Sequence, residues 1–412
     1  MSKSIIVLGA GMVGVCTALH LQRLGYTVCL VDRREPGRET SYGNAGLIQR
    51  EAVEPYPFPR EFGKILRVAL RRGFDIRYHW AALPTLMPRL AGYWSASAPA
   101  RYRDIVPPYA RLILHAIDEH RVLMEAADCL ALARPGGYRA IFSRADSFAL
   151  ATARAERLER DWGVHSAVES AADLRRAQPM LAADAVGAVH WQDPWSVVDP
   201  GALVTAYATL FVRQGGEVRQ GDAQSLRGEG AGWAVETVDG VLTAQQAVLA
   251  LGPWADGMLR RLGYRLPLFV KRGYHRHYVC ARPPSVPLQD ADRGFMMSPM
   301  RAGLRVATGA EFASLGARAT PLQMTRAESA ARRWLDLGEA VEPEPWLGAR
   351  PCTADMLPLI GPAPRHPGLW FNFGHGHQGF TLGPISGRLL AEMLDGASPV
   401  VDPAPYAPSR YA

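Results

Sequence analysis

Three glycines and a carboxylate near the N-terminus have the residue types and the spacing that bind a dinucleotide. Gly9, Gly11 and Gly14 follow an apolar run at residues 5–8, and Asp32 ends a second apolar run. Glycine allows the tight turn, the approach of backbone to a pyrophosphate and the packing of helix on strand, while the acid accepts hydrogen bonds from ribose hydroxyls. The pattern predicts a strand–helix–strand unit whose helix N-terminus faces phosphates.

A second glycine-rich turn predicts that one ligand is held from both ends of the chain. The apolar run at residues 368–373 leads into the glycine- and histidine-rich stretch 374–383 and then into a helical pattern, so free backbone amides again meet the ligand. The segment 39–46 adds small side chains and hydroxyls that can lie against phosphate oxygens and a flat ring. NAD enzymes rarely need such a span, whereas an extended FAD does.

The intervening elements must bring these turns together. Residues 60–130 are mainly helical in pattern and interrupt the nucleotide-binding strands, and a helix start at Asp199-Pro200 marks the return to that fold. The apolar strand 246–251 then runs into a turn at Gly252, where the carboxyl edge of a parallel sheet binds ligands. Residues 266–312 alternate in polarity, which favours antiparallel strands.

Composition indicates a globular protein of two or three domains. The 412 residues are 48% hydrophobic and 21% charged, and no apolar stretch is long enough to span a membrane. The five cysteines are dispersed without metal-ligand spacing, so we expect no metal site and a reducing, cytoplasmic location. The net charge of +7 comes with no basic run longer than three residues and no motif for nucleic acid, which argues against that partner.

One basic and apolar segment leaves two interpretations open. It is either a surface helix with its following loop, or a surface with weak attraction to anionic lipid, which would give peripheral contact with the inner face of the cell membrane. The basic residues and their apolar neighbours are Arg67, Arg71, Arg72 and Arg77 with Ile65, Leu66, Val68, Leu70, Phe74 and Trp80.

Several motifs along the whole chain resemble the D-amino-acid oxidase class of FAD-dependent oxidoreductases, and most closely the bacterial D-amino-acid dehydrogenases. Besides the first glycine turn, the resemblance rests on the segments 39–48, 99–103, 250–254, 271–274, 347–351 and 374–381. It implies an α/β fold with two discontinuous domains. A Rossmann-type FAD-binding domain would comprise residues 1–60, 185–265 and 345–400. A substrate domain with a mixed sheet (α+β) would comprise 61–184 and 266–344, and the proline-rich residues 401–412 would form a loose tail.

The resemblance also implies which residues contact FAD. Their loops would reach the adenosine, the pyrophosphate and the flavin ring in turn. The expected contacts are Gly9, Gly11, Met12, Val13, Gly14, Asp32, Arg33, Thr40, Ser41, Asn44, Ala45, Gly46, Leu47, Val218, Gly252, Trp254, Gly374, Gly376, His377, Gln378, Gly379, Phe380 and Thr381.

Arg350 matches the arginine that binds the substrate carboxylate in the family. A guanidinium can hold a carboxylate through two parallel hydrogen bonds and so orient the neighbouring Cα–H. The sequence departs from glycine oxidases where a tyrosine helps this arginine, because residues 295–297 read Phe-Met-Met. We expect Tyr274 or His275 to replace that hydroxyl.

An apolar substrate wall is the second consequence of that departure. Met296 and Met297, together with Tyr42, would line the pocket and favour a bulky or cyclic substrate. His375 and His377 are not assigned as general bases, because amine oxidation can proceed by hydride transfer once the amine is neutral. Cys352 lies where relatives attach FAD covalently, but the residues after it do not continue that pattern, so we expect FAD to be non-covalent.

The predicted reaction is the oxidation of a D-amino acid, or a cyclic imino acid such as D-proline, by hydride transfer to flavin N5. The resemblance favours a quinone or other carrier as the electron acceptor. Two alternatives remain open: an oxygen-using oxidase of glycine, sarcosine or another secondary amine, and a non-catalytic FAD-binding subunit of a larger dehydrogenase.

Overall fold

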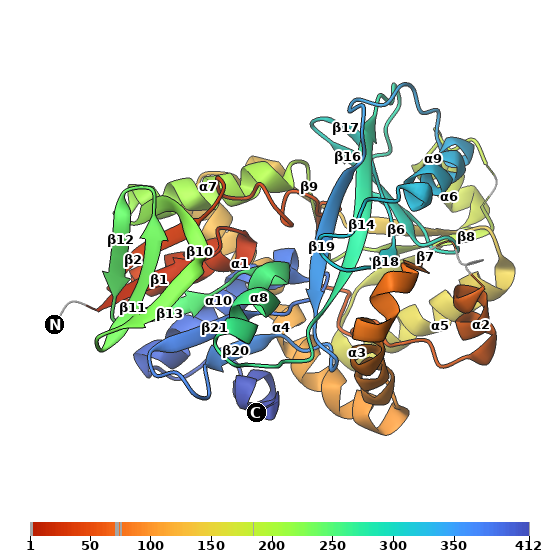
Figure 1. The fold of residues 1–412 in the computed structure, drawn as a ribbon. Helices are drawn as coiled ribbons and strands as arrows, with labels where there is room; N and C mark the ends of the chain where they lie inside the picture. Colours follow the sequence, from red (N-terminus) through yellow and green to blue (C-terminus); the bar gives the residue numbers. More distant parts are fainter. Residues whose placement is uncertain (1–2, 71–73, 75, 184, 412) are drawn as a thin grey trace.

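The computed structural model describes residues 3–70, 74, 76–183 and 185–411. Its strands form two large sheets and one small one within this part of the chain. Figure 1 shows the two large sheets next to each other, with helices α1 (Met12–Arg23) and α10 (Gly379–Asp395) between the nucleotide-type strands and the rest of the molecule.

The first large sheet has a parallel centre. Its strands, in spatial order, are β12 (Gly240–Ala244), β11 (Gly232–Thr237), β10 (Glu217–Glu229), β2 (Thr27–Asp32), β1 (Ser4–Leu8), β13 (Gln246–Leu249), β21 (Leu369–Phe373) and β20 (Leu359–Pro362). The five strands from β10 to β21 pair in parallel, and the outer strands pair antiparallel. The parallel strands therefore place their carboxyl ends, with the glycine turn and Asp32, along one edge.

Both faces of this sheet are covered, which explains its continuous apolar strands. On one face, Ile5 and Val7 pack among α1, α10, α4 (Pro99–Ala126) and α7 (Pro200–Arg213). On the other face, Ile6 and Leu8 pack with β11 and α8 (Ala255–Arg261).

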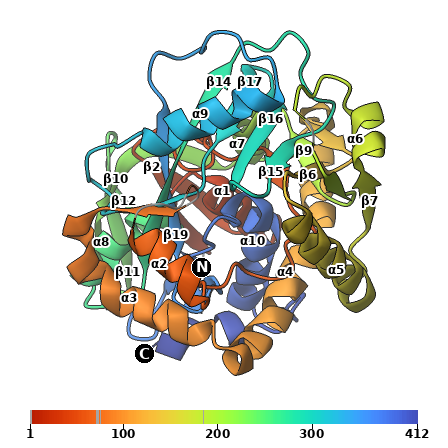
Figure 2. The same cartoon turned by 90° about the vertical axis from the view of Figure 1, so that its right-hand side faces the viewer.

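The second large sheet is mixed. Its main path is β4 (Ile76–Tyr78), β18 (Ala310–Phe312), β14 (Phe269–Tyr278), β17 (Gly303–Ala307), β16 (Phe295–Met300), β15 (Leu288–Asp290), β6 (Tyr138–Phe142), β8 (Gly187–Trp191) and β7 (Ser166–Ser170), with β19 (Trp346–Cys352) paired to β14. The remaining elements lie around the two large sheets, as Figure 2 shows from the side for its labelled helices. They are α2 (Phe62–Ala69), α3 (Leu83–Ala96), α5 (Ala145–Trp162), α6 (Ala171–Ala177), α9 (Leu322–Trp334), the small sheet of β3 (Leu47–Ile48), β9 (Trp195–Val197) and β5 (Ala133–Pro135), and the short helices η1 (Trp80–Ala82), η2 (Leu130–Leu132), η3 (Gly252–Trp254), η4 (Ala404–Tyr406) and η5 (Pro408–Tyr411).

Two predicted domain boundaries do not follow the strand pairing. The boundaries at 185 and 345 grouped β8 and β19 with the nucleotide-binding domain, whereas both strands pair in the mixed sheet. The antiparallel partner of each strand, β6 for β8 and β14 for β19, lies in that sheet.

The expectation of a loose C-terminal tail is corrected. Residues 401–411 pack against the body of the protein, and Tyr406 is fully buried with its hydroxyl donating to Pro108 O at 2.7 Å. Arg410 Nε donates to Asp355 Oδ2 at 2.7 Å. Proline-rich composition therefore did not mean mobility here, because these anchors hold the segment. Among the described residues, no helix is long and apolar enough to cross a bilayer.

Candidate active site

The first glycine turn has a geometry that other residues cannot adopt. Gly9 has φ +107°, and a Cβ added at Gly14 would lie 1.7 Å from Gly9 O. Asp32 Oδ2 accepts a hydrogen bond from Ala10 N at 2.6 Å, which ties the end of β2 to the turn. A Cβ on Gly11 would meet Ser41 Oγ at 3.4 Å and nothing nearer among the described residues, so this backbone is open to a ligand.

The turn opens into a cavity of about 1830 Å³ that extends between the two large sheets. At its nucleotide end, Arg33 lies over the Trp254 ring at 4.6 Å, and Asp222 and Gln224 line the wall. Four carboxylates line the cavity in the described structure, and all belong to this end or its approach: Asp32, Glu39, Asp222 and Asp256.

The loop at residues 40–47 is held by the mixed sheet. Arg305 Nη1 donates to Tyr42 O at 2.9 Å, and Ser298 Oγ donates to Ala45 O at 2.7 Å. Asn44 Oδ1 accepts from the amides of residues 46 and 47, which closes the loop locally. Burial lowers the pKa of Arg305 to about 10, but the guanidinium stays charged at neutral pH.

The loop at residues 374–378 presents buried polar atoms without protein partners. Nε2 of His375, Nε2 of His377 and Oε1 of Gln378 make no hydrogen bond within the described part of the chain. Burial lowers the pKa of both histidines to about 3, with Arg350 and Lys271 adding to the shift at His377. Both rings are therefore neutral at physiological pH, and α10 begins just after them.

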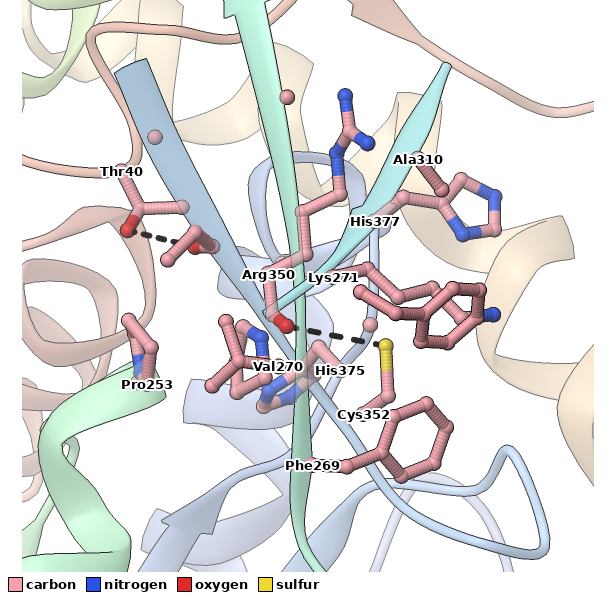
Figure 3. Close-up of a pocket in the computed structure, with 18 of the residues that line it drawn as sticks. Thr40, Pro253, Phe269, Val270, Lys271, Ala310, Arg350, Cys352, His375 and His377 are labelled. Carbon is pink, nitrogen blue, oxygen red and sulfur yellow. Dashed lines mark hydrogen bonds between the residues drawn. The ribbon is translucent and has the colours of Figure 1, made fainter. Parts of the chain in front are cut away.

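Arg350 lies on β19 at the wall of the cavity (Figure 3). Its Nη1 donates to Gly309 O at 2.8 Å, and its Nη2 lies 3.4 Å from Thr308 O. No carboxylate pairs with Arg350 among the described residues, and burial lowers its pKa. A partly buried guanidinium with only carbonyl partners has donors left for an anionic ligand.

Lys271 is the cross-strand partner of Arg350, because the two residues are in register on β14 and β19. Its Nζ donates to the Tyr93 hydroxyl at 3.1 Å and lies 4.4 Å from the centre of that ring. Both cations line the cavity, and Figure 3 shows Lys271 close to His377 and Cys352. The charged side chains at the substrate end are thus cations, whereas the nucleotide end carries carboxylates together with Arg33.

Of the two proposed partners of Arg350, one lines the cavity with its hydroxyl already hydrogen-bonded, and the other lies outside the lining. Tyr274 lines the cavity, but its hydroxyl donates to Glu311 Oε2 at 3.0 Å and accepts from Thr320 N at 2.7 Å. His275 lies outside the cavity lining and stacks on Trp346 at 4.8 Å. The suggestion that either residue replaces the missing hydroxyl is therefore not retained.

Strand alternation divides the predicted substrate wall. Met296 lines the cavity, whereas Met297 is fully buried in the core on the opposite face of β16. Tyr42 likewise lies outside the lining and packs against Trp346. Successive side chains on a strand point to opposite faces, so adjacent methionines could not both face a substrate.

Most of the expected cofactor residues line the cavity, and six do not. Those at the lining are Gly9, Gly11, Met12, Val13, Asp32, Arg33, Thr40, Ser41, Asn44, Ala45, Leu47, Gly252, Trp254, Gly376, His377, Gly379 and Phe380. The six others are Gly14, Gly46, Val218, Gly374, Gln378 and Thr381, which lie behind it or in the adjoining elements.

Sequence reasoning missed several polar residues at the substrate end: Gln49, Tyr56, Tyr93, Tyr138, Lys271 and Gln289. Tyr56 is 58% accessible, but that surface faces the cavity, and the surrounding protein raises its pKa. Its ring lies 4.9 Å from that of His377. The signal for Tyr56 was the proline-flanked segment 55–59, which cannot form a helix.

The cavity opens at a surface formed by α2, η1 and α3. Ile65, Trp80, Met87 and Trp94 line the cavity and are also exposed large hydrophobic residues. Of the predicted basic residues here, Arg71 and Arg72 and the side chain of Arg67 lie outside the described structure.

Comparison with known proteins gives consistent matches. The family model described as FAD dependent oxidoreductase matches residues 4–393. The D-amino-acid oxidase of Bradyrhizobium diazoefficiens is 30% identical and covers 99% of each chain. The D-amino acid dehydrogenase of Dechloromonas aromatica is 30% identical over 96% of this chain and 97% of its own. The crystal structure of glycine oxidase from Geobacillus kaustophilus has a similar fold, with a TM-score of 0.73 at 19% identity over the full length of both chains.

The residues around the cavity fit FAD. The cavity exceeds the roughly 1,000 Å³ upper range of ordinary ligand pockets, as a dinucleotide with a substrate requires. The open backbone at Gly11 suits a pyrophosphate, and the unpaired polar atoms of His375, His377 and Gln378 suit the hydrogen-bonding edge of a flavin.

Proposed function

Because the chain belongs to the DAO family of FAD-dependent oxidoreductases, we propose that it oxidises a D-amino acid, or a cyclic imino acid such as D-proline, and passes the electrons to a carrier. Oxidation of amino acids with FAD is the activity class of the family. The choice among its members rests on the substrate end of the cavity. The observation that carries the proposal is Arg350, a partly buried cation at the cavity wall without a carboxylate partner in the described structure.

Arg350 would bind the substrate carboxylate and orient the Cα–H bond. Its guanidinium is already fixed by the carbonyl of Gly309, so little side-chain entropy is lost on binding. Met296 on the adjoining wall would contact the substrate side chain. FAD, when bound, supplies the hydride acceptor, its N5 atom.

The loop before α10 would supply electrostatics instead of proton transfer. His375 and His377 have pKa values of about 3, so neither accepts a proton at neutral pH. The N-terminus of α10, a 17-residue helix, carries partial positive charge that would stabilise negative charge on the reduced cofactor.

We propose that FAD is held without a covalent bond. Cys352 lines the cavity, but burial raises its pKa, so the nucleophilic thiolate is a minor species. Its Sγ contacts Arg350 O at 3.7 Å. A thiol in this state acts as a small apolar wall residue.

A membrane quinone is the carrier that the cavity mouth favours. Leu66, Leu70 and Trp80 are 45%, 54% and 62% exposed, and residues 62–96 contain six basic residues and one acidic residue. Apolar side chains with interfacial tryptophan and basic charge bind anionic bilayers.

We expect the protein to sediment with phosphatidylglycerol vesicles, and less with phosphatidylcholine vesicles. The double variant Leu66→Glu and Leu70→Glu should not sediment with either. Equal sedimentation of that variant would contradict membrane contact.

Anaerobic mixing with candidate substrates tests the proposed reaction. D- and L-amino acids, D-proline and N-methyl amino acids are each added to the FAD-loaded protein, and loss of flavin absorbance reports reduction. We expect bleaching by D-enantiomers or D-proline, and slow reoxidation in air. Bleaching by glycine or sarcosine with stoichiometric peroxide would instead support an oxidase. If no amino acid bleaches the flavin, the catalytic proposal is wrong and an FAD-binding subunit is the remaining interpretation.

A further inference from the structure

A buried carboxyl group lies directly behind the wall at the substrate end. Glu51 is 3% exposed, and its Oε1 accepts hydrogen bonds from Gln49 Nε2 at 2.7 Å and from the Tyr138 hydroxyl at 3.1 Å. Its Oε2 has no partner in the described part of the chain. A buried carboxylate normally pairs with a cation, and no ion pair to Glu51 is formed by the described residues.

Both partners of Glu51 reach the cavity. Gln49 and Tyr138 line it, from the segment after β3 and from β6 respectively. Gln49 Oε1 also accepts from Gln378 Nε2 at 2.9 Å, at the start of α10. Hydrogen bonds therefore connect the carboxyl group to the cavity from two sides.

The groups that face Glu51 leave its charge largely uncompensated. Tyr138 from β6 and Tyr109 from α4 are neutral phenols whose pKa values are raised by burial, and Tyr56, from the same loop as Glu51, is a third neutral phenol near it. Arg154 from α5 is the charged group that acts on it, weakly and from a distance. Burial dominates and raises the pKa of Glu51 to about 7, so the carboxyl group can take up or release a proton near neutral pH.

The proposed reaction needs such a group. An amino acid arrives as an ammonium ion, and the nitrogen must lose a proton before hydride can leave Cα. The histidines of the cavity are neutral and too weakly basic to accept a proton at neutral pH, and the lining carboxylates lie toward the nucleotide end.

We propose that Glu51, acting through Tyr138, holds the proton that the substrate ammonium loses. The N–H bond of the ammonium breaks and its proton passes to the Tyr138 hydroxyl oxygen, while the proton of that hydroxyl passes to Glu51 Oε1. A neutral amine and a protonated carboxyl group result, and no electrons are exchanged in this step. Glu51 acts through Tyr138 and does not itself touch the substrate. The inference rests on the proposed amino-acid oxidation.

The pH dependence of anaerobic flavin reduction tests the proposal. Glu51→Gln keeps an acceptor for Gln49 and Tyr138 but cannot take a proton. With a substrate that bleaches wild type, we expect its rate at pH 7 to fall about 100-fold and to recover at alkaline pH, where the free amine forms without help. Tyr138→Phe, which keeps the carboxyl group, should show the same alkaline shift. The control is Glu119→Gln, since Glu119 on α4 is also buried but pairs with Arg388 on α10 and does not line the cavity.

An infrared measurement gives a second readout that needs no turnover. The ligand is 2-aminoisobutyrate, which has no Cα–H to transfer. Its binding at pH 8 should produce the carbonyl stretch of a new carboxylic acid in wild type and not in Glu51→Gln. A wild-type pH profile in Glu51→Gln or Tyr138→Phe, with the flavin still bleached, would overturn the proposal. Failure of the proposed function looks different, because wild type itself would then not be bleached. If Glu51→Gln does not fold, the pH profile of Tyr138→Phe tests the proposal in its place.

Discussion

The two ends of the cavity are built in different ways. At the nucleotide end, many of the lining groups come from one short stretch, Gly9 to Arg33, and they combine backbone atoms, carboxylates and the Arg33 guanidinium. At the substrate end, side chains from β6, β14, β19 and the loop before α10 meet, and the charged ones are cations. One end is specified by local backbone geometry, and the other by the register between distant strands.

At the nucleotide end, the addition of a single methyl group should therefore have the largest effect on stability and cofactor binding. In Gly14→Ala the added Cβ would lie 1.7 Å from Gly9 O, so the turn or α1 must move. We expect a loss of several kcal/mol of stability, in the upper range for single substitutions, and loss of bound flavin. Flavin absorbance of the purified protein and its thermal midpoint are the measurements. Gly228→Ala in β10 is the control, because nothing lies within 4 Å of its added Cβ. Normal flavin content in Gly14→Ala would show that the turn tolerates adjustment.

The substrate end should respond in the opposite way, with lost turnover and retained cofactor. Arg350→Ala removes two charge-assisted hydrogen bonds to the substrate carboxylate, each worth about 1.5–3 kcal/mol. We therefore expect kcat/KM to fall by roughly 10²–10⁴-fold while flavin content stays at the wild-type level. Arg282→Ala, at an exposed position, is the control and should leave kcat/KM unchanged. Unchanged kinetics in Arg350→Ala would remove this residue from the site.

The same contrast explains what the sequence could predict. The glycine turn and Asp32 lie on adjacent elements, and the spacing alone identifies them. Arg350 was identified only through the resemblance of its motif. Lys271 became visible only through the pairing of β14 with β19, which no local pattern contains.

The alternation of side chains between the two faces of a strand set a second limit on prediction. Which of Met296 and Met297 faces the cavity depends on the phase of β16, and a one-residue slip would exchange them. His275 was displaced from its expected role for the same reason, since its neighbour Tyr274 occupies the cavity face of β14. The hydroxyl of Tyr274, on that face, donates its hydrogen bond to Glu311. Residue type indicated the chemistry, but the strand phase decided the access.

The smallest predicted effect concerns buried histidines, which occur both in the nucleotide-binding part of the molecule and near the substrate end. His20 lies in the last turn of α1, the helix whose N-terminus follows the glycine turn, and burial lowers its pKa to about 3, as it does for His375 near the substrate end. Below the unfolded pKa of about 6.5 the unfolded chain binds protons that the folded protein does not, so stability falls as the pH drops from about 6.5 toward 3. At pH 5 each histidine should lower the free energy of unfolding by about 2 kcal/mol relative to pH 8.

Urea unfolding of wild type and His20→Gln at both pH values measures this difference. The variant has a fixed cost of its own at pH 8, so the informative quantity is the difference between pH values, which should be about 2 kcal/mol smaller in His20→Gln. An equal difference in the two proteins would mean that His20 is protonated in the folded state, and α1 would then be less tightly packed beneath the glycine turn than its burial indicates.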